Sequence, residues 1–136
     1  MTSVRPRKSS SLADALANPA GVIQLSVIGT PIPALSDDIR ILRDMEMLTL
    51  NGNGLAALSP AVYELPNLRV LHLFACRIEH LPASLAKLSQ LEELDLRANR
   101  LVVYPFCAED FPVLKRLDIT FNPCTYNPCT ESMRTD

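Results

Sequence analysis

The sequence lacks the features that mark membrane, secreted and nucleic-acid-binding proteins. No stretch reaches the ~18 consecutive apolar residues of a membrane span, and no apolar segment of the signal-peptide kind follows the basic start. Basic residues are not in excess: the formal net charge is −2, and the balance of +2 in residues 1–21 leaves −4 for the remainder. A nucleic-acid reader usually carries a basic face on its folded part. We therefore expect no membrane span, no secretion and no nucleic-acid partner.

The cysteines lack the spacing that binds metals. The four cysteines, Cys76, Cys107, Cys124 and Cys129, include no C-x-x-C pair, so neither a zinc ribbon nor a redox motif is predicted. A disulfide or metal site at Cys124 and Cys129 is the alternative, although its spacing is unusual and no histidine lies near it. We expect reduced thiols, no metal, no cofactor and a location inside the cell, in the cytoplasm.

What the sequence does contain is an internal repeat. With Leu68 as position 1, the same pattern starts at Val22, Met45, Leu91 and Leu114, and every step is 23 residues. Position 4 is leucine in all five repeats, and position 9 is asparagine in three of them. The length of 136 residues suits one domain. A pattern kept over five registers without insertions predicts one repetitive architecture for most of the chain.

Each repeat changes its leucine spacing midway. Leu71 and Leu73 lie two residues apart, which is strand spacing, whereas Leu81, Leu85 and Leu88 recur at four and three, which is helical spacing. Each repeat is therefore predicted to form a short strand, to turn at position 9 and to return through a helical or 3-10 turn.

The repeat resembles that of the leucine-rich repeat family, whose pattern L-x-x-L-x-L-x-x-N/C-x-L is closely met by "LRVLHLFACRI" and "LEELDLRANRL". The resemblance covers residues 22 to about 124, and the second half looks like the intracellular 23-residue class found in Ras-pathway scaffolds. It implies an α/β solenoid with five short parallel strands on the concave side and helical or 3-10 turns on the convex side. At position 9, an inward asparagine amide would satisfy backbone groups of the next turn, and Cys76 would fill the same small slot as a structural residue.

We expect four segments along the chain. Residues 1–10 form a disordered basic tail, with an organelle transit sequence as the alternative. Residues 11–21 form an N-terminal cap helix that starts after Ser11, with a tail holding a transient turn as the alternative. Residues 22–124 hold the five repeats, and residues 125–136 are a C-terminal tail.

Function is expected on the strand side, where outward positions of neighbouring repeats stack into columns about 4.8 Å apart. The position-2 column alternates in charge from Glu46 to Lys115, which favours lateral pairing that supports the register. Other columns place an apolar patch beside charged residues, and aromatic, methionine and arginine side chains are enriched at interface cores. The residues expected to bind a partner are Met47, Val70, His72, Phe74, Asp95, Arg97, Thr120 and Phe121.

Two other interpretations apply to the same face. Phe74 and Arg97 could form a cation–π pair that serves only the surface. His72 beside Asp95 has the composition of a general base and its orienting carboxylate. However, no nucleophile is suitably placed, and a flat strand face offers no deep cleft that excludes water. We therefore expect no catalytic residues.

The C-terminal end of the array is expected to lack a lid. After Asn122 only 14 residues remain, with two prolines and no amphipathic periodicity from which to build a covering helix. The last strand would expose one apolar flank and a row of unpaired backbone groups. The residues expected at this edge interface, covered by a partner, a second copy or the chain's own tail, are Leu114, Leu117 and Ile119.

The favoured hypothesis is a non-catalytic module that presents its concave strand face to a protein partner. The alternative is a structural subunit of a large assembly, such as an axonemal or organellar complex, held through its ends and tails. That alternative would place the protein in the cilium or the mitochondrion. The resemblance indicates the fold and leaves the partner open, because unrelated functions share this scaffold.

Overall fold

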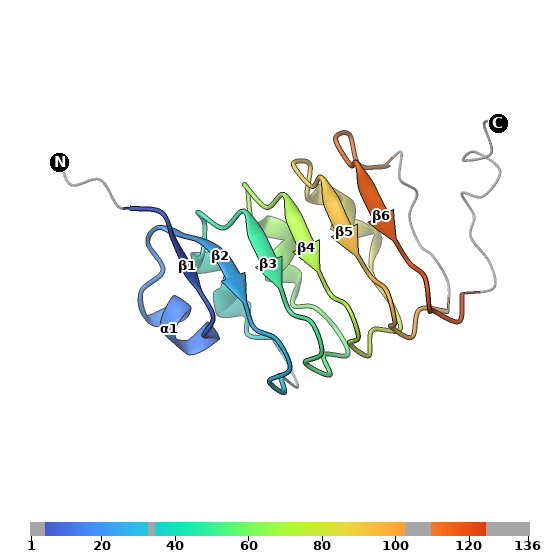
Figure 1. The fold of residues 1–136 in the computed structure, drawn as a ribbon. Helices are drawn as coiled ribbons and strands as arrows, with labels where there is room; N and C mark the ends of the chain where they lie inside the picture. Colours follow the sequence, from blue (N-terminus) through green and yellow to red (C-terminus); the bar gives the residue numbers. More distant parts are fainter. Residues whose placement is uncertain (1–4, 33–34, 103–109, 125–136) are drawn as a thin grey trace.

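The computed structural model of the protein describes residues 5–32, 35–102 and 110–124. Six strands form one parallel sheet in chain order, and short helical segments lie behind it (Figure 1). The strands are β1 (Arg7–Ser9), β2 (Val22–Ser26), β3 (Met47–Thr49), β4 (Val70–His72), β5 (Glu93–Asp95) and β6 (Arg116–Asp118). The helical segments are α1 (Leu12–Ala17) and the 3-10 helices η1 (Asp37–Ile41), η2 (Pro60–Glu64) and η3 (Ala83–Lys87). The predicted α/β solenoid is confirmed.

The register of the sheet follows the sequence repeat. Met47 lies opposite Val70, Val70 opposite Glu93, and Glu93 opposite Arg116, so equivalent positions of successive repeats are neighbours. Position 4 points inward from every repeat strand, and four of the five leucines there are buried while the last, Leu117, is partly buried. The predicted outward columns are therefore present in the structure.

In every repeat, a residue with a left-handed backbone stands at position 8, three residues after the strand ends. The φ angles are +74° at Gly29, +68° at Gly52, +58° at Ala75, +56° at Ala98 and +62° at Phe121. Glycine adopts this conformation without strain, whereas residues with a side chain are disfavoured there. The small residues at position 8 thus have a backbone reason, and the phenylalanine of the last repeat departs from it.

Asparagine at position 9 joins each turn to its neighbour, as predicted. The Asn99 amide donates to the Leu73 carbonyl at 2.7 Å, and its oxygen accepts from the Ile78 backbone N–H at 3.1 Å. Asn122 repeats both contacts one register later, with the Leu96 carbonyl at 2.8 Å and the Leu101 N–H at 3.0 Å. The buried Asn99 and the half-buried Asn122 thus satisfy backbone groups that would otherwise lack partners.

Cys76 occupies the same position in the third repeat and is structural. Its thiol is buried and donates to the Leu50 carbonyl at 3.1 Å. Burial raises the pKa of Cys76 above its ordinary value, which keeps the sulfur protonated and unreactive. Cys107 and Cys129 lie outside the described residues.

The N-terminal end differs from prediction at residues 7–9. Instead of belonging to a disordered tail over residues 1–10, they form β1, which pairs in parallel with β2. The Arg7 backbone N–H donates to the Gly21 carbonyl at 2.8 Å. The physical reason is that β2 would otherwise be an open sheet edge with unpaired backbone groups, and the preceding chain passes beside it. The array therefore has a sixth strand that its repeat does not predict.

The predicted cap helix is present in a shorter form, α1. The Ser11 hydroxyl accepts from the Asp14 backbone N–H at 3.1 Å, which is the expected N-cap contact. Ala15 is fully buried and joins the core, while Asn18 ends the helix before Pro19. β1 thus forms the N-terminal edge of the sheet, and α1 packs against β1, β2 and η1 at the same end (Figure 1).

Candidate functional site on the strand face

The position-2 column forms a continuous ion-pair ladder, as predicted. Arg69 contacts Glu92 at 2.7 Å and Glu46 at 3.3 Å, and Lys115 contacts Glu92 at 3.3 Å. The hydrogen bond from Arg69, followed by that from Lys115, lowers the pKa of Glu92 below its ordinary value. Because these charges are satisfied within the chain, this column supports the register and leaves little electrostatic attraction for a partner.

Beside the ladder, the third and earlier repeats present apolar side chains. Met47 and Val70 are half-buried register partners on β3 and β4. Phe74 is 36% exposed just beyond β4, and Ile28 is 67% exposed at the same position two repeats earlier. Ile28 is not among the residues that the sequence predicted for the site. The only indication in the sequence is an isoleucine at an outward strand position. A single residue of this kind indicates an apolar surface only when the residues in the neighbouring columns are apolar as well.

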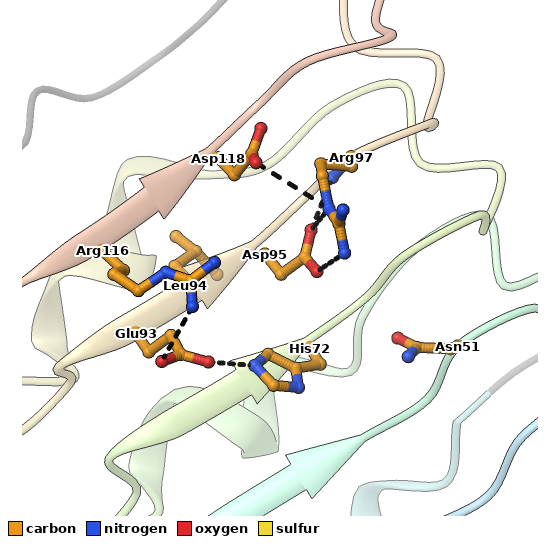
Figure 2. Close-up of a pocket in the computed structure, with 8 residues that line it drawn as sticks. All are labelled: Asn51, His72, Glu93, Leu94, Asp95, Arg97, Arg116 and Asp118. Carbon is orange, nitrogen blue, oxygen red and sulfur yellow. Dashed lines mark hydrogen bonds and ion pairs between the residues drawn. The ribbon is translucent and has the colours of Figure 1, made fainter.

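A charged hollow of about 210 Å³ lies on the same face, lined mainly by the fourth and fifth repeats with one residue each from the second and third (Figure 2). Its lining residues are Asn51, His72, Glu93, Leu94, Asp95, Arg97, Arg116 and Asp118. Glu93, Arg116, Asp118 and Asn51 were absent from the sequence-predicted site. Their outward positions were visible in the repeat, whereas the hollow itself depends on side-chain directions.

The predicted neighbours His72 and Asp95 share a register position but do not form a pair. His72 Nε2 hydrogen-bonds to Glu93 on the diagonal, while Asp95 points to Arg97 (Figure 2). Arg97 donates to Asp95 Oδ1 at 2.9 Å and to Oδ2 at 2.8 Å. The His–Asp arrangement of a general base, which the sequence offered only as an alternative, is not formed: the guanidinium occupies both oxygens of the carboxylate that would orient the imidazole.

Arg97 links the charged hollow to the apolar patch. Its guanidinium carbon lies 4.8 Å from the Phe74 ring centroid, which confirms the cation–π pair. Burial alone would raise the pKa of Asp95, but the hydrogen bonds from Arg97 outweigh it, so this pKa lies below its ordinary value. Arg97 is consequently held in one geometry by a carboxylate and an aromatic ring.

The last two candidates, Thr120 and Phe121, lie at the C-terminal edge of the face. The Thr120 hydroxyl donates to Asp118 at 2.7 Å and its backbone N–H donates to the same oxygen at 3.0 Å. These contacts lower the pKa of Asp118, the backbone hydrogen bond most. Phe121 is 80% exposed. The structure thus places Met47 beside Val70, His72 beside Asp95 and Arg97 over the Phe74 ring, whereas Thr120 and Phe121 lie beyond β6 at one side.

Within the described residues, no helix is long and apolar enough to cross a membrane. Within the same part of the chain, no group of three or more histidine, cysteine, aspartate or glutamate side chains could hold a metal ion.

A family model described as leucine rich repeat matches residues 43–101 and, in an overlapping second match, residues 66–124. Together these matches span more than half of the chain, so the chain belongs to the leucine-rich repeat family. Repeat domains of this kind bind other proteins through the extended concave surface that the stacked strands create.

A solved leucine-rich repeat protein of Leptospira interrogans is similar to the chain, with 25% sequence identity and a TM-score of 0.66. The similarity covers 90% of this chain and 37% of that protein, so the chain spans little more than a third of that relative's length. No curated protein matches the chain.

Proposed function

We propose that the protein is a non-catalytic interaction module that presents its concave strand face to a protein partner. The observation that carries the proposal is an apolar patch on a face whose charged side chains are already paired. Ile28 and Phe74 are exposed, while the adjoining Arg69, Glu92 and Asp95 are held by partners within the chain. Burial of the patch would be favourable, and the surrounding ion pairs would form its polar rim.

Phe74 and Arg97 are the proposed anchor of this interface. Aromatic and arginine side chains dominate interface energetics when they are well packed and central. Arg97 is fixed by two hydrogen bonds to Asp95 and by the Phe74 ring, so little side-chain entropy remains to be lost on binding. The anchor side chains are therefore already ordered in the free protein, which lowers the entropy cost of binding.

The experiment starts with native-salt capture of the binding protein and its identification, followed by affinity measurements with variants. Phe74→Ala combined with Arg97→Glu should weaken binding by about 2 kcal/mol or more while unfolding stays cooperative. Ile41→Ala is the matched control, because Ile41 is an exposed apolar residue on η1, away from the strand face. Equal affinity of the double variant and the wild type would reject this face as the interface.

A second candidate function is a structural subunit of a large assembly, axonemal or organellar, held through its ends and tails. It is supported by the exposed Val113 and Phe121, which flank β6 at the end of the array. The interaction module should fold alone and exchange partners, whereas the subunit should co-purify with its assembly. We place the module in the cytoplasm, in keeping with the intracellular repeat class that its sequence resembles, and the subunit in the cilium or mitochondrion.

A further inference from the structure

The outer edge of β6 carries backbone groups without partners in the described part of the chain. The carbonyls of Asp118 and Thr120 accept from β5 and the turn after it, at 2.8 and 2.9 Å, so these residues face inward along the sheet. Backbone groups alternate in direction along a strand, and therefore Leu117, Ile119 and Phe121 face the outer edge. Among the described residues, none accepts a hydrogen bond from the N–H of Ile119 or Phe121.

The equivalent groups of inner repeats are paired. The N–H of Leu73, at the position of Ile119, donates to the Asp95 carbonyl at 2.8 Å. The N–H of Ala75, at the position of Phe121, donates to the Arg97 carbonyl at 3.0 Å. In the inner repeats, these N–H groups donate to the next repeat. The outer edge of β6 therefore has the geometry to pair with a further strand.

Apolar side chains surround the same edge. Leu114, Leu117 and Ile119 are partly buried, although their counterparts in the inner repeats are buried. Val113, which precedes β6 in the sequence, is 43% exposed, and Phe121, which follows it, is 80% exposed. Phe121 also keeps a left-handed backbone, with φ +62°, where glycine or alanine stands in every other repeat. An exposed aromatic side chain on a disfavoured backbone indicates a function outside the chain's own packing.

The sequence of β6 is complementary to itself when the strand is reversed. Arg116 and Asp118 are equidistant from Leu117, and Val113 and Phe121 are equidistant from it as well. In an antiparallel pair with a two-fold axis at Leu117, Arg116 of each copy lies opposite Asp118 of the other. The outward-directed backbone groups of Leu117, Ile119 and Phe121 then all face the second copy.

The charges also select this register over its neighbours. A two-fold axis at Arg116 would place two arginines opposite each other, and an axis at Asp118 would place two aspartates opposite each other. Directly opposed like charges destabilise a strand pair, and opposite charges stabilise it. Asp118 Oδ1 accepts from Thr120, but Oδ2 has only a long contact to Arg97, at 3.9 Å, among the described residues. The Arg116 contact to Glu93 is equally long, at 3.9 Å, so Arg116 and Asp118 Oδ2 can pair across the edge.

We propose that β6 pairs antiparallel with β6 of a second copy, about a two-fold axis at Leu117. The sheet of each copy continues into the other, and two Arg116–Asp118 pairs fix the register. Leu117 meets Leu117 of the second copy, and Phe121 reaches the end of the strand where Val113 of that copy lies. Isologous interfaces of this kind require a surface that is complementary to itself, which this edge is. The dimer would use Arg116 and Asp118 from the lining of the charged hollow, whereas the proposed anchor, Phe74 and Arg97, would lie outside the new interface.

The test measures sedimentation of the full chain from low to high micromolar concentration. The wild type should show a concentration-dependent dimer. Arg116→Asp and Asp118→Arg each place like charges opposite one another, so each should weaken self-association at least about tenfold. Lys87→Glu, at an exposed site on η3, changes the charge by the same amount as Arg116→Asp and should leave the dimer intact.

A mixing experiment separates the proposed register from general damage. In an equimolar mixture of Arg116→Asp and Asp118→Arg chains, every cross-strand position again joins opposite charges, so heterodimers should form although neither variant dimerises alone. The double variant Arg116→Asp with Asp118→Arg should also recover self-association. A wild type that stays monomeric at high micromolar concentration would overturn the proposal. So would a dimer that both single substitutions leave unchanged, or a mixture that does not associate.

Discussion

The two ends of the solenoid differ in how the apolar flank of the terminal repeat strand is covered. At the N-terminal end, β1 and α1 cover the first repeat strand, and Leu25 beneath them is fully buried. At the C-terminal end, the equivalent Leu117 is only partly buried, and Phe121 projects from a strained turn. A repeat array must end in residues that tolerate water or in residues that meet a partner. The N-terminal end is therefore covered by elements of the chain itself, whereas the last described strand, β6, is the edge at which we propose association.

The largest expected effect compares Leu25 with Leu117, which occupy position 4 of the first and last repeats. Leu25→Ala should lower the free energy of unfolding by about 2–5 kcal/mol, because it leaves a cavity in a packed core. Leu117→Ala should lower it by about 1 kcal/mol, since its site is partly open to water. Urea denaturation at a concentration where the chain is monomeric measures both. Equal losses would mean that the C-terminal end is as well covered as the N-terminal end.

The next effect compares asparagines inside the array and at its end. Asn99→Ala should cost about 1–3 kcal/mol of stability, because the Ile78 N–H and the Leu73 carbonyl lose their buried partner. Asn122→Ala should cost less, since its half-buried surroundings admit water to the freed groups. Thermal and urea unfolding provide the measurement. A denaturation midpoint that Asn99→Ala leaves unaltered would show that the turn does not depend on the amide.

A smaller effect concerns the N-terminal cap alone. Ser11→Ala removes the acceptor of the Asp14 N–H at the start of α1 and should cost about 1 kcal/mol. Amide exchange of residues 12–17 should accelerate with it, while exchange in β5 follows global unfolding. Ser11→Asp, which retains an acceptor, is the matched control and should behave as the wild type. Loss of protection in both variants would point to packing rather than to the cap.

The smallest expected effect concerns Phe121. Phe121→Gly should raise the stability of the monomer by up to about 1 kcal/mol, because glycine accepts the left-handed backbone without steric cost. Phe121→Ala keeps the backbone cost and should bring no such gain. Both substitutions should weaken the dimer, because each removes the aromatic ring. A stability unchanged by glycine would mean that the left-handed turn is not strained.

The sequence predicted which residues are neighbours on the strand face, but not which polar partners their side chains bind. The repeat predicted that Met47, Val70 and Glu93 would lie side by side, because stacked repeats place equal positions in one column. It did not predict that His72 would pair with Glu93 and leave Asp95 to Arg97. The position in the repeat specifies where the backbone carries a side chain. The rotamer of that side chain, and the competition among neighbouring polar groups, decide which partner it binds.

Periodicity alone determined the architecture of this protein: the 23-residue step, the buried leucines at position 4 and the asparagine turns follow from which residues recur. The tertiary structure alone decided the two ends. Arg7–Ser9 carry no hydrophobic period and became a strand because the open edge of β2 offered them hydrogen-bond partners. The significance of Val113 and Phe121 likewise appears only when β6 is seen as the last described strand, with its outer backbone groups unpaired among the described residues. Local pattern specifies what each repeat buries, and a terminus depends on which surfaces the folded array brings within reach of each other.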